Sequence, residues 1–317
     1  MIMRMFGIAA MFFCLLSQTS FANEDALDSA LQNARTSCAG ISDEFDKLKT
    51  LAGINTAITG VGTLAGGGAV ATGFVKQSRD AQIAKLEMAK LTKISYNNNS
   101  SYNASATDVK SAMNSYYEKH KNDTPEQIET EIDKLTKQSK NLGNWRTGLL
   151  AGSTATNIAG AIIAGNNRAS SDLHGAVADC KSSVSALRGA YMQARLDGAN
   201  TKKIEQAITI VSECGKWENT DISKIDNRAT GAMWSSVAGA TLGTAGTITS
   251  AFANTDKTRN DDSDNGKQKE KNLNTASNVL AIGTTAASLT ATIFNATQIA
   301  AIKKASAVAD ECQEALQ

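Results

Sequence analysis

Residues 50–75 read TLAGINTAITGVGTLAGGGAVATGFV, a stretch of helical length that carries no charged residue and consists mainly of Gly, Ala and Thr. Three further uncharged stretches rich in small residues cover residues 147–167, 229–255 and 272–302. Small uncharged side chains let helix backbones approach closely, either in a tight bundle or inside a bilayer. The sequence therefore predicts a protein organised around closely packed helices.

The N-terminus, residues 1–22, has the three parts of a secretory signal peptide. One basic residue, Arg4, precedes an apolar run from Met5 to Leu16, and Ser20-Phe21-Ala22 forms a small-x-small cleavage site. We expect the mature chain to begin at Asn23, with an uncleaved anchor helix as the alternative. The expected location is exported, periplasmic or extracellular, with membrane association left open.

An internal duplication is indicated by matching segments at one common offset. Lys140–Leu142 and Lys271–Leu273 both read KNL, and Ala176–Asp179 and Ala307–Asp310 both read AVAD. Biased composition raises the background of such matches, but it does not explain two anchors in the same register. We predict a first helical half at 23–198 with an inserted segment at 95–140, and a second half at 199–317.

Four cysteines follow the signal peptide: Cys38, Cys180, Cys214 and Cys312. An even number in an oxidising compartment indicates two disulfides, and counting alone allows three pairings. In each predicted half the two cysteines lie outside the outer ends of a helical hairpin, so folding the hairpin brings them to a similar height. The sequence therefore predicts the pairs Cys38–Cys180 and Cys214–Cys312.

The predicted fold is all-α: long helical hairpins from two related halves, packed as a Gly/Ala/Ser/Thr-rich helix bundle with no significant sheet. Pro125 is the one proline of the chain. It occupies the first helical position of a capping box, Thr124-Pro125-Glu126-Gln127, where proline is favoured. No run of alternating β-branched residues is long enough to form a sheet.

Glycines of the uncharged segments are the predicted helix-packing residues. In the first segment, small residues recur at alternating intervals of four and three residues, which predicts a coiled-coil-like glycine-zipper stripe. Each glycine costs an isolated helix about 1 kcal/mol against alanine, so close packing has to compensate. The predicted packing residues are Gly53, Gly60, Gly67, Gly148, Gly152, Gly239, Gly243 and Gly283. Low-complexity composition without a packing role is the alternative.

The sequence leaves open whether these helices cross a membrane. Their length allows it, because about 20 residues span the hydrocarbon core. Composition favours a soluble or peripheral bundle, since the segments contain asparagine and many hydroxyl groups. Polar stripes, such as Asn55 with Thr59 and the stripe of Asn295, are expected to face solvent or to line a pore. We expect Trp145 and Trp234 to plug the bundle ends, with interfacial anchoring as the alternative.

The sequence contains no motif for catalysis or cofactor binding. A nucleophile elbow, a phosphate-binding loop and an H-E-x-x-H pattern are all missing. The net charge is +1, with 32 basic and 31 acidic residues well mixed, which gives no basic surface for nucleic acid. We therefore expect no enzyme, cofactor, metal, nucleic acid or small-molecule substrate. The expected function is that of an exported structural or partner-binding envelope protein that self-associates; the alternative is a membrane-inserted glycine-zipper oligomer forming a pore or channel.

The inserted segment at 95–140 is the predicted partner-binding element, because it has no counterpart in the second half. It contains Tyr96, Tyr102, Tyr116 and Tyr117, and tyrosine is enriched at protein interfaces. The alternative is that the insertion covers the hairpin and buries these rings. The expected partners are proteins, including a second copy of this chain.

Signal-peptide cleavage is testable by N-terminal sequencing of the exported protein, which should begin at Asn23 because signal peptidase cuts after a small-x-small site. The variant Ala22→Arg should block cleavage, whereas Phe21→Leu, at the unrestricted middle position, should not. An exported protein whose intact mass includes residues 1–22 would show an uncleaved anchor instead.

Overall fold

A computed structural model describes residues 24–97, 119–198, 200–255, 258 and 263–317. These residues form long helices joined by short turns, and no strand occurs among them. The all-α prediction is thus confirmed. The predicted signal peptide at 1–22 lies outside the described residues.

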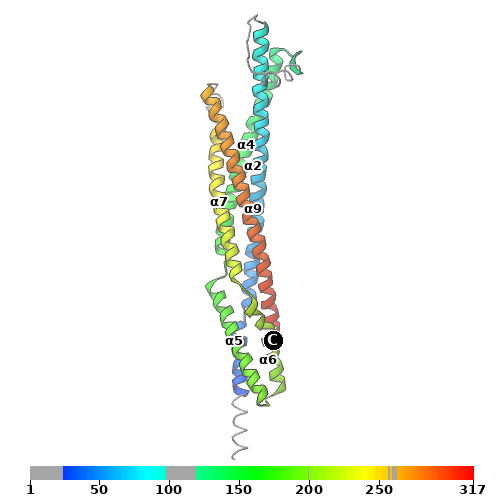
Figure 1. Cartoon of the computed structure of the whole chain (residues 1–317), viewed down its shortest axis with the longest axis vertical. Helices are drawn as coiled ribbons and strands as arrows, with labels where there is room; N and C mark the ends of the chain where they lie inside the picture. The colour runs from blue at the N-terminus through cyan, green and yellow to red at the C-terminus, as the bar shows by residue number, and fades with distance from the viewer. Residues whose placement is uncertain (1–23, 98–118, 199, 256–257, 259–262) are drawn as a thin grey trace, which may run out of the picture. The chain divides into compact units, whose positions relative to one another are not determined.

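The helices, labelled in Figure 1, follow one another with few interruptions. After a helix at residues 24–38 come α2 (Ile41–Asn97), α4 (Pro125–Asn166), α5 (Ser171–Leu196), α6 (Thr201–Cys214), the 3-10 helix η1 (Gly215–Asn219), α7 (Ser223–Ala253) and α9 (Asp264–Ala315). The predicted capping box begins α4: Thr124 N donates to Gln127 Oε1 at 2.7 Å, and Gln127 N donates to Thr124 Oγ1 at 3.3 Å. Gly198 turns the chain between α5 and α6 with a φ of 77°.

Buried positions along the long helices alternate at intervals of three and four residues. In α2 the series begins with Ile41, Phe45, Leu48, Ala52 and Asn55 and continues in the same rhythm. The other long helices, α4, α7 and α9, repeat this spacing. A buried stripe with a period of 3.5 residues is typical of helices that pack side by side as coiled coils.

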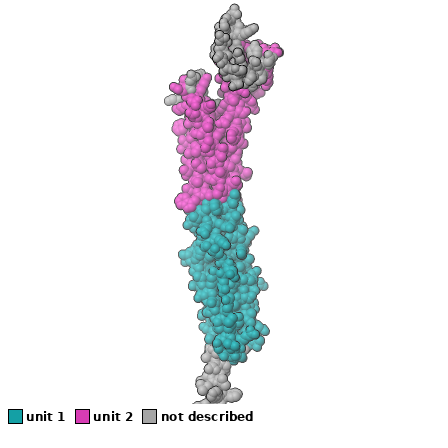
Figure 2. All heavy atoms as spheres, in the orientation of Figure 1, with its two compact units in different colours: residues 1–56, 162–233, 293–317 teal, residues 57–161, 234–292 magenta. Residues whose placement is uncertain are grey.

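The chain divides by its contacts into two compact units, coloured in Figure 2. Unit 1 contains residues up to Thr56, Ile162–Met233 and Ile293–Gln317; unit 2 contains Ala57–Ala161 and Trp234–Thr292. Each unit draws helices from both predicted halves of the sequence. The contact units therefore do not coincide with 23–198 and 199–317, and the duplication itself stays a prediction.

Unit 1 has a conventional apolar core. Leucine, isoleucine and valine side chains from the helix at 24–38, α2, α5, α6, α7 and α9 form one buried cluster. Phe45 and Trp217 stack in it, with ring centroids 5.7 Å apart. The surface is ionic: Lys216 donates hydrogen bonds to Glu213 and Glu311, which raise the pKa of its ammonium group. This distribution is typical of a helix bundle in water.

The structure contains both predicted disulfides within the unit 1 core. Cys38–Cys180 joins the helix at 24–38 to α5, and Cys214–Cys312 joins α6 to α9. Their Cα atoms are 4.7 and 4.5 Å apart, and the chain separations are 142 and 98 residues. Bridges that close loops of this size restrict the unfolded chain strongly.

Removing one bridge should destabilise unit 1 without releasing the other. The double variant Cys214→Ala with Cys312→Ala should lower the free energy of unfolding by about 2–5 kcal/mol, because the unfolded chain regains freedom. Denaturant unfolding measures this loss. Non-reducing peptide mapping of the same variant should still recover Cys38 linked to Cys180; wild-type peptides that link Cys38 to Cys214 would refute the pairing.

Candidate functional site

The most unusual part of the molecule is the seam of unit 2, which we define as the residues that α2, α4, α7 and α9 bury between them within the uncharged segments. Leu150 is the one large apolar side chain among these buried positions in the described residues. The others are Thr59, Gly62, Gly66, Ala69, Gly73, Ser153, Asn157, Gly160, Ser236, Gly239, Gly243, Gly246, Ser250, Ala253, Asn274, Ser277, Asn278, Ala281, Thr284, Ser288 and Ala291. The seam of unit 2 therefore consists mainly of small and polar residues, whereas Leu86, Ile128 and Leu135 form a separate apolar cluster outside the uncharged segments.

Hydrogen bonds between helices satisfy part of this polar seam. Ser153 Oγ of α4 donates to the carbonyl of Gly62 in α2 at 2.9 Å. Asn157 Nδ2 of α4 donates to Ser288 Oγ of α9 at 2.8 Å. Other hydroxyls bond back to their own helix, as Thr284 does to the carbonyl of Leu280 at 2.8 Å. The seam thus joins its helices by polar contacts where most bundles use apolar ones.

Close approach of the helices depends on glycine at particular seam positions. A β-carbon added at Gly66 would lie 2.6 Å from Thr285 Oγ1 and 3.3 Å from Thr285 Cα. One added at Gly239 would lie 2.8 Å from Asn157 Nδ2. Gly243 and Gly283 also face neighbouring helices: a β-carbon at Gly243 would clash with Thr154, and one at Gly283 would lie 3.1 Å from Leu242 Cδ1.

Five of the glycines predicted to pack against a neighbouring helix do not do so within a single copy of the chain. A β-carbon added at Gly53, Gly60, Gly67, Gly148 or Gly152 would meet no atom within 4 Å. In α2 the stripe that turns inward is offset from the predicted one and includes Gly62, Gly66 and Gly73. Small residues occupy both faces of this segment, so the spacing alone did not distinguish the packed face from the open one.

Many large apolar side chains of unit 2 in or next to its uncharged segments are exposed. We call this set the apolar belt: Val61, Leu64, Phe74, Val75, Trp145, Ile158, Trp234, Val237, Ile248, Phe252, Val279, Ile282 and Leu289. Leu64 is 78% exposed and Val279 is 63% exposed. Leu51, Ile54, Ile162 and Ile293 of unit 1, which belong to the same uncharged segments, are exposed as well. In the uncharged part of unit 2 the buried side chains are mostly small and polar and many large apolar ones are exposed, which is the inverse of the arrangement in unit 1.

Two predictions about orientation are corrected by this inversion. Asn55, Thr59 and Asn295 were expected on a solvated face or a pore wall, but all three are fully buried. Trp145 and Trp234 were expected as buried plugs, but they are 68% and 63% exposed. The reason is that the heptad positions of these helices are occupied by the small and polar residues, which places the large apolar ones outside.

Three helical stretches have an apolar window long enough to cross a membrane: Glu24–Leu91, Pro125–Leu196 and Asn265–Ala315. Their mean hydropathies over that window are 1.4, 1.3 and 1.4. In each case 28% of the window is buried inside the protein. Most of each window is therefore available to the surrounding medium.

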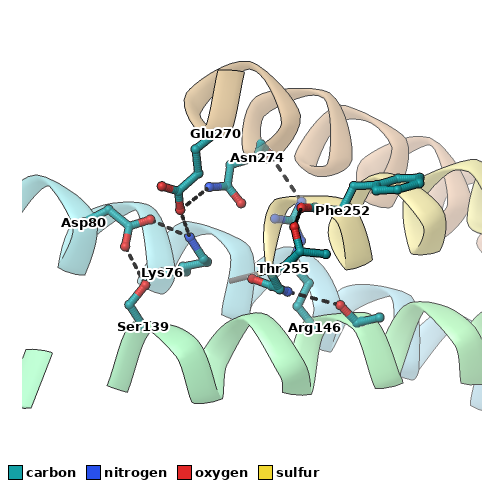
Figure 3. Close-up of polar contacts among 10 residues, drawn as sticks. Lys76, Asp80, Ser139, Arg146, Phe252, Thr255, Glu270 and Asn274 are labelled. Atoms are coloured by element: carbon teal, nitrogen blue, oxygen red, sulfur yellow. Dashed lines mark hydrogen bonds and ion pairs between the residues drawn. The ribbon is translucent and has the colours of Figure 1, made fainter. Parts of the chain in front are cut away.

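A cluster of charged and polar side chains lies beside the ends of the uncharged segments of unit 2 (Figure 3). Lys76, which is 1% exposed, lies 2.7 Å from Asp80 Oδ2 and 3.4 Å from Glu270 Oε1. Asp80 also accepts a hydrogen bond from Ser139 of α4. Arg146 of α4 is buried nearby, and its Nη2 lies 3.4 Å from the carbonyl of Asn274. These two buried cations were not among the predicted residues, although both occupy heptad positions directly beside an uncharged segment.

Most of the predicted partner-binding tyrosines lie outside the described residues. Tyr102, Tyr116 and Tyr117 lie outside the described residues, and for Tyr96 only the helical backbone is described. Partner binding through the segment at 95–140 therefore stays a prediction. Comparison of the chain with protein-family models, curated proteins and solved structures finds no match.

Two adjacent glycines provide a matched test of the seam. The variant Gly66→Leu should lower the free energy of unfolding by about 1–3 kcal/mol or more, because the new side chain meets the backbone of Thr285. Gly67→Leu places the same side chain in open space and should change stability by no more than about 0.5 kcal/mol. Denaturant unfolding monitored by circular dichroism compares them. Equal effects of the two substitutions would contradict the assigned packing face.

Proposed function

We propose that the protein is a structural component of the cell envelope that is embedded in a lipid bilayer through unit 2. Unit 1, with its apolar core, ionic surface and two disulfides, is then the part that works in water and meets protein partners. This proposal keeps the predicted non-enzymatic, exported role. For the uncharged helices we favour insertion in a membrane over a soluble bundle.

The observation that carries the proposal is the inverted polarity of unit 2. Moving a large apolar side chain from water to an apolar environment is worth about 1.5–3 kcal/mol. In water, the apolar belt would forgo this stabilisation at every one of its positions, while polar seam residues would occupy the interior. In hydrocarbon the same arrangement is favourable, because the belt meets lipid and the polar groups bond to one another.

Details of the helices agree with a lipid environment. Helices in a bilayer gain nothing from burying leucine against leucine, so small residues and interhelical hydrogen bonds hold them together. The seam of unit 2 has this composition, with contacts such as Asn157 to Ser288. Exposed Trp145 and Trp234 lie near the starts of two uncharged segments, where interfacial tryptophans are common.

Self-association is the second candidate for covering the apolar belt. It is favoured by the open glycines Gly53, Gly60, Gly67, Gly148 and Gly152, which would allow close approach of a helix from a second copy. The pore alternative has less support, because the polar seam residues that would line a channel bond to each other within one chain. Self-association in lipid is compatible with the anchoring proposal, whereas a detergent-free oligomer in water is not.

A charge in the belt should weaken membrane association without unfolding the protein. Leu64→Lys introduces a cation at a position that is 78% exposed, and burying it in hydrocarbon costs about 2.5–3.5 kcal/mol. Leu196→Lys is the matched control, since Leu196 in unit 1 is 82% exposed. Flotation with phosphatidylcholine vesicles should recover wild type and Leu196→Lys in the lipid fraction but much less Leu64→Lys.

The competing candidates predict other results. If wild type is extracted by carbonate and is a monodisperse monomer without detergent, the anchoring proposal fails. If wild type is a detergent-free oligomer that Leu64→Lys dissociates, the belt is a protein interface in water.

A further inference from the structure

A basic residue directly flanks each uncharged segment at the end that belongs to unit 1. Lys49 precedes residues 50–75, Arg168 follows residues 147–167, Arg228 precedes residues 229–255, and Lys303 with Lys304 follows residues 272–302. We call these five residues the cationic collar. They come from four separate parts of the sequence, and the fold of unit 1 decides whether they gather.

Contacts between α2 and α9 bring two collar residues to one level. Asn55 Nδ2 of α2 donates to Asn295 Oδ1 of α9 at 2.9 Å. Further along both helices, the hydroxyl of Ser42 donates to the carboxylate of Asp310. The two helices are therefore antiparallel here. Lys49 and Lys303 each stand about midway between these two contacts, so they lie at a similar height in the bundle.

The other two segments reach the same region of α9. Gln298 Nε2 donates to the carbonyl of Asn167, the residue before Arg168, at 2.7 Å. Arg228 Nη1 of α7 donates to the carbonyl of Thr297 at 2.6 Å. A helix rises 1.5 Å per residue, so these contact points lie within about 10 Å of Lys303 along α9. The collar is thus a band of cations around one level of unit 1.

Most of the collar is not neutralised within the chain. Among the described residues no ion pair involves Arg168, Arg228, Lys303 or Lys304. Lys49 has a carboxylate partner, Asp46, at 3.8 Å.

The carboxylates near the collar arginines do not change this. Both oxygens of Asp226 already accept hydrogen bonds, from the backbone N–H of Ala169 and from the ring of His174, each at 2.7 Å. Asp172, four residues after Arg168, forms no ion pair among the described residues.

Apolar side chains of unit 1 are exposed in the same helices, five to ten residues from a collar residue in the sequence. Ile54 is 47% exposed, Ile162 is 61% exposed and Ile293 is 56% exposed. Exposed apolar groups followed by cations are typical of the boundary between hydrocarbon and lipid headgroups, where long cationic side chains reach the phosphates.

We propose that the cationic collar binds the headgroup phosphates of anionic phospholipids. This inference rests on the proposed anchoring of unit 2 and adds the class of lipid that the protein selects. Phosphatidylcholine carries a choline cation that compensates its phosphate, whereas phosphatidylglycerol has a net negative charge. The collar therefore gains net attraction from phosphatidylglycerol, and each cation near an anionic surface favours binding about fivefold.

Quenching of tryptophan fluorescence by brominated lipid measures this selectivity on the full-length protein in phosphatidylcholine bilayers. Trp234 is the reporter, because it is 63% exposed and follows Met233, whose Sδ lies 3.5 Å from Arg168 Nη2. Trp217 is fully buried, and Trp145→Phe removes the other exposed indole. Brominated phosphatidylglycerol and brominated phosphatidylcholine are compared at equal fractions, and the ratio of their binding constants is obtained.

The ratio should favour phosphatidylglycerol about fivefold or more in the reporter protein. It should fall towards one in 0.5 M sodium chloride, because salt screens exposed charges. Replacing Arg168, Lys303 and Lys304 by glutamine should also bring it towards one. Arg195→Gln is the control: Arg195 is an exposed arginine at the opposite end of α5 from Arg168, and its loss should leave the ratio unchanged.

The outcomes separate the collar from the anchoring. Quenching by both lipids with a ratio of one, or a ratio that the triple variant retains while its circular dichroism is unchanged, overturns the collar and leaves the anchoring in place. If the triple variant does not fold, Arg168→Gln alone should lower the ratio and Arg168→Lys should preserve it; equal ratios in these two variants overturn the collar. Absence of quenching by either lipid overturns the anchoring and the collar together.

Discussion

Close helix approach at glycine is the constraint on which the rest of unit 2 depends. A β-carbon at Gly66 would lie 3.3 Å from the backbone Cα of Thr285, and one at Gly239 would lie 2.8 Å from the side-chain amide of Asn157. Apart from Leu150, the buried positions of this seam have small or polar side chains, so many contacts between the helices come from hydroxyl and amide groups. The large apolar residues of the same helices are left for the outside. The small, polar seam and the exposed apolar belt thus have the same cause: small and polar residues occupy the inward-facing positions of these helices.

The helices of unit 1 pack through large apolar side chains instead of small and polar ones. Its heptad positions contain Phe45, Leu48 and their equivalents, which form an apolar core, and its surface is charged. Two disulfides add stability in an oxidising compartment by restricting the unfolded chain. Since α2 and α9 contribute residues to both units, the buried positions along one helix change from mainly apolar in unit 1 to small and polar in the seam of unit 2.

Buried charges mark where the uncharged pattern of unit 2 ends. Lys76 directly follows residues 50–75, and Arg146 directly precedes residues 147–167. Both continue the buried stripe of their helices beyond the seam, so they are enclosed by the helices instead of facing the medium. Lys76 is paired with Asp80 and Glu270, whereas no ion pair involves Arg146 among the described residues.

The sequence by itself determined the helical class, the cap that begins α4 and the positions of the uncharged segments. These follow from local chemistry: one proline, glycine-rich helices and the placement of charges. The pairs Cys38–Cys180 and Cys214–Cys312 were also predictable, because hairpin geometry left one sensible pairing. Only the tertiary structure decided which face of each helix turns inward. In residues 50–75, Gly53, Gly60 and Gly67 form one small stripe and Gly62, Gly66 and Gly73 another, so either could pack. The choice depends on the side chains that neighbouring helices present, such as Thr285 against Gly66, and those contacts exist only in the folded chain.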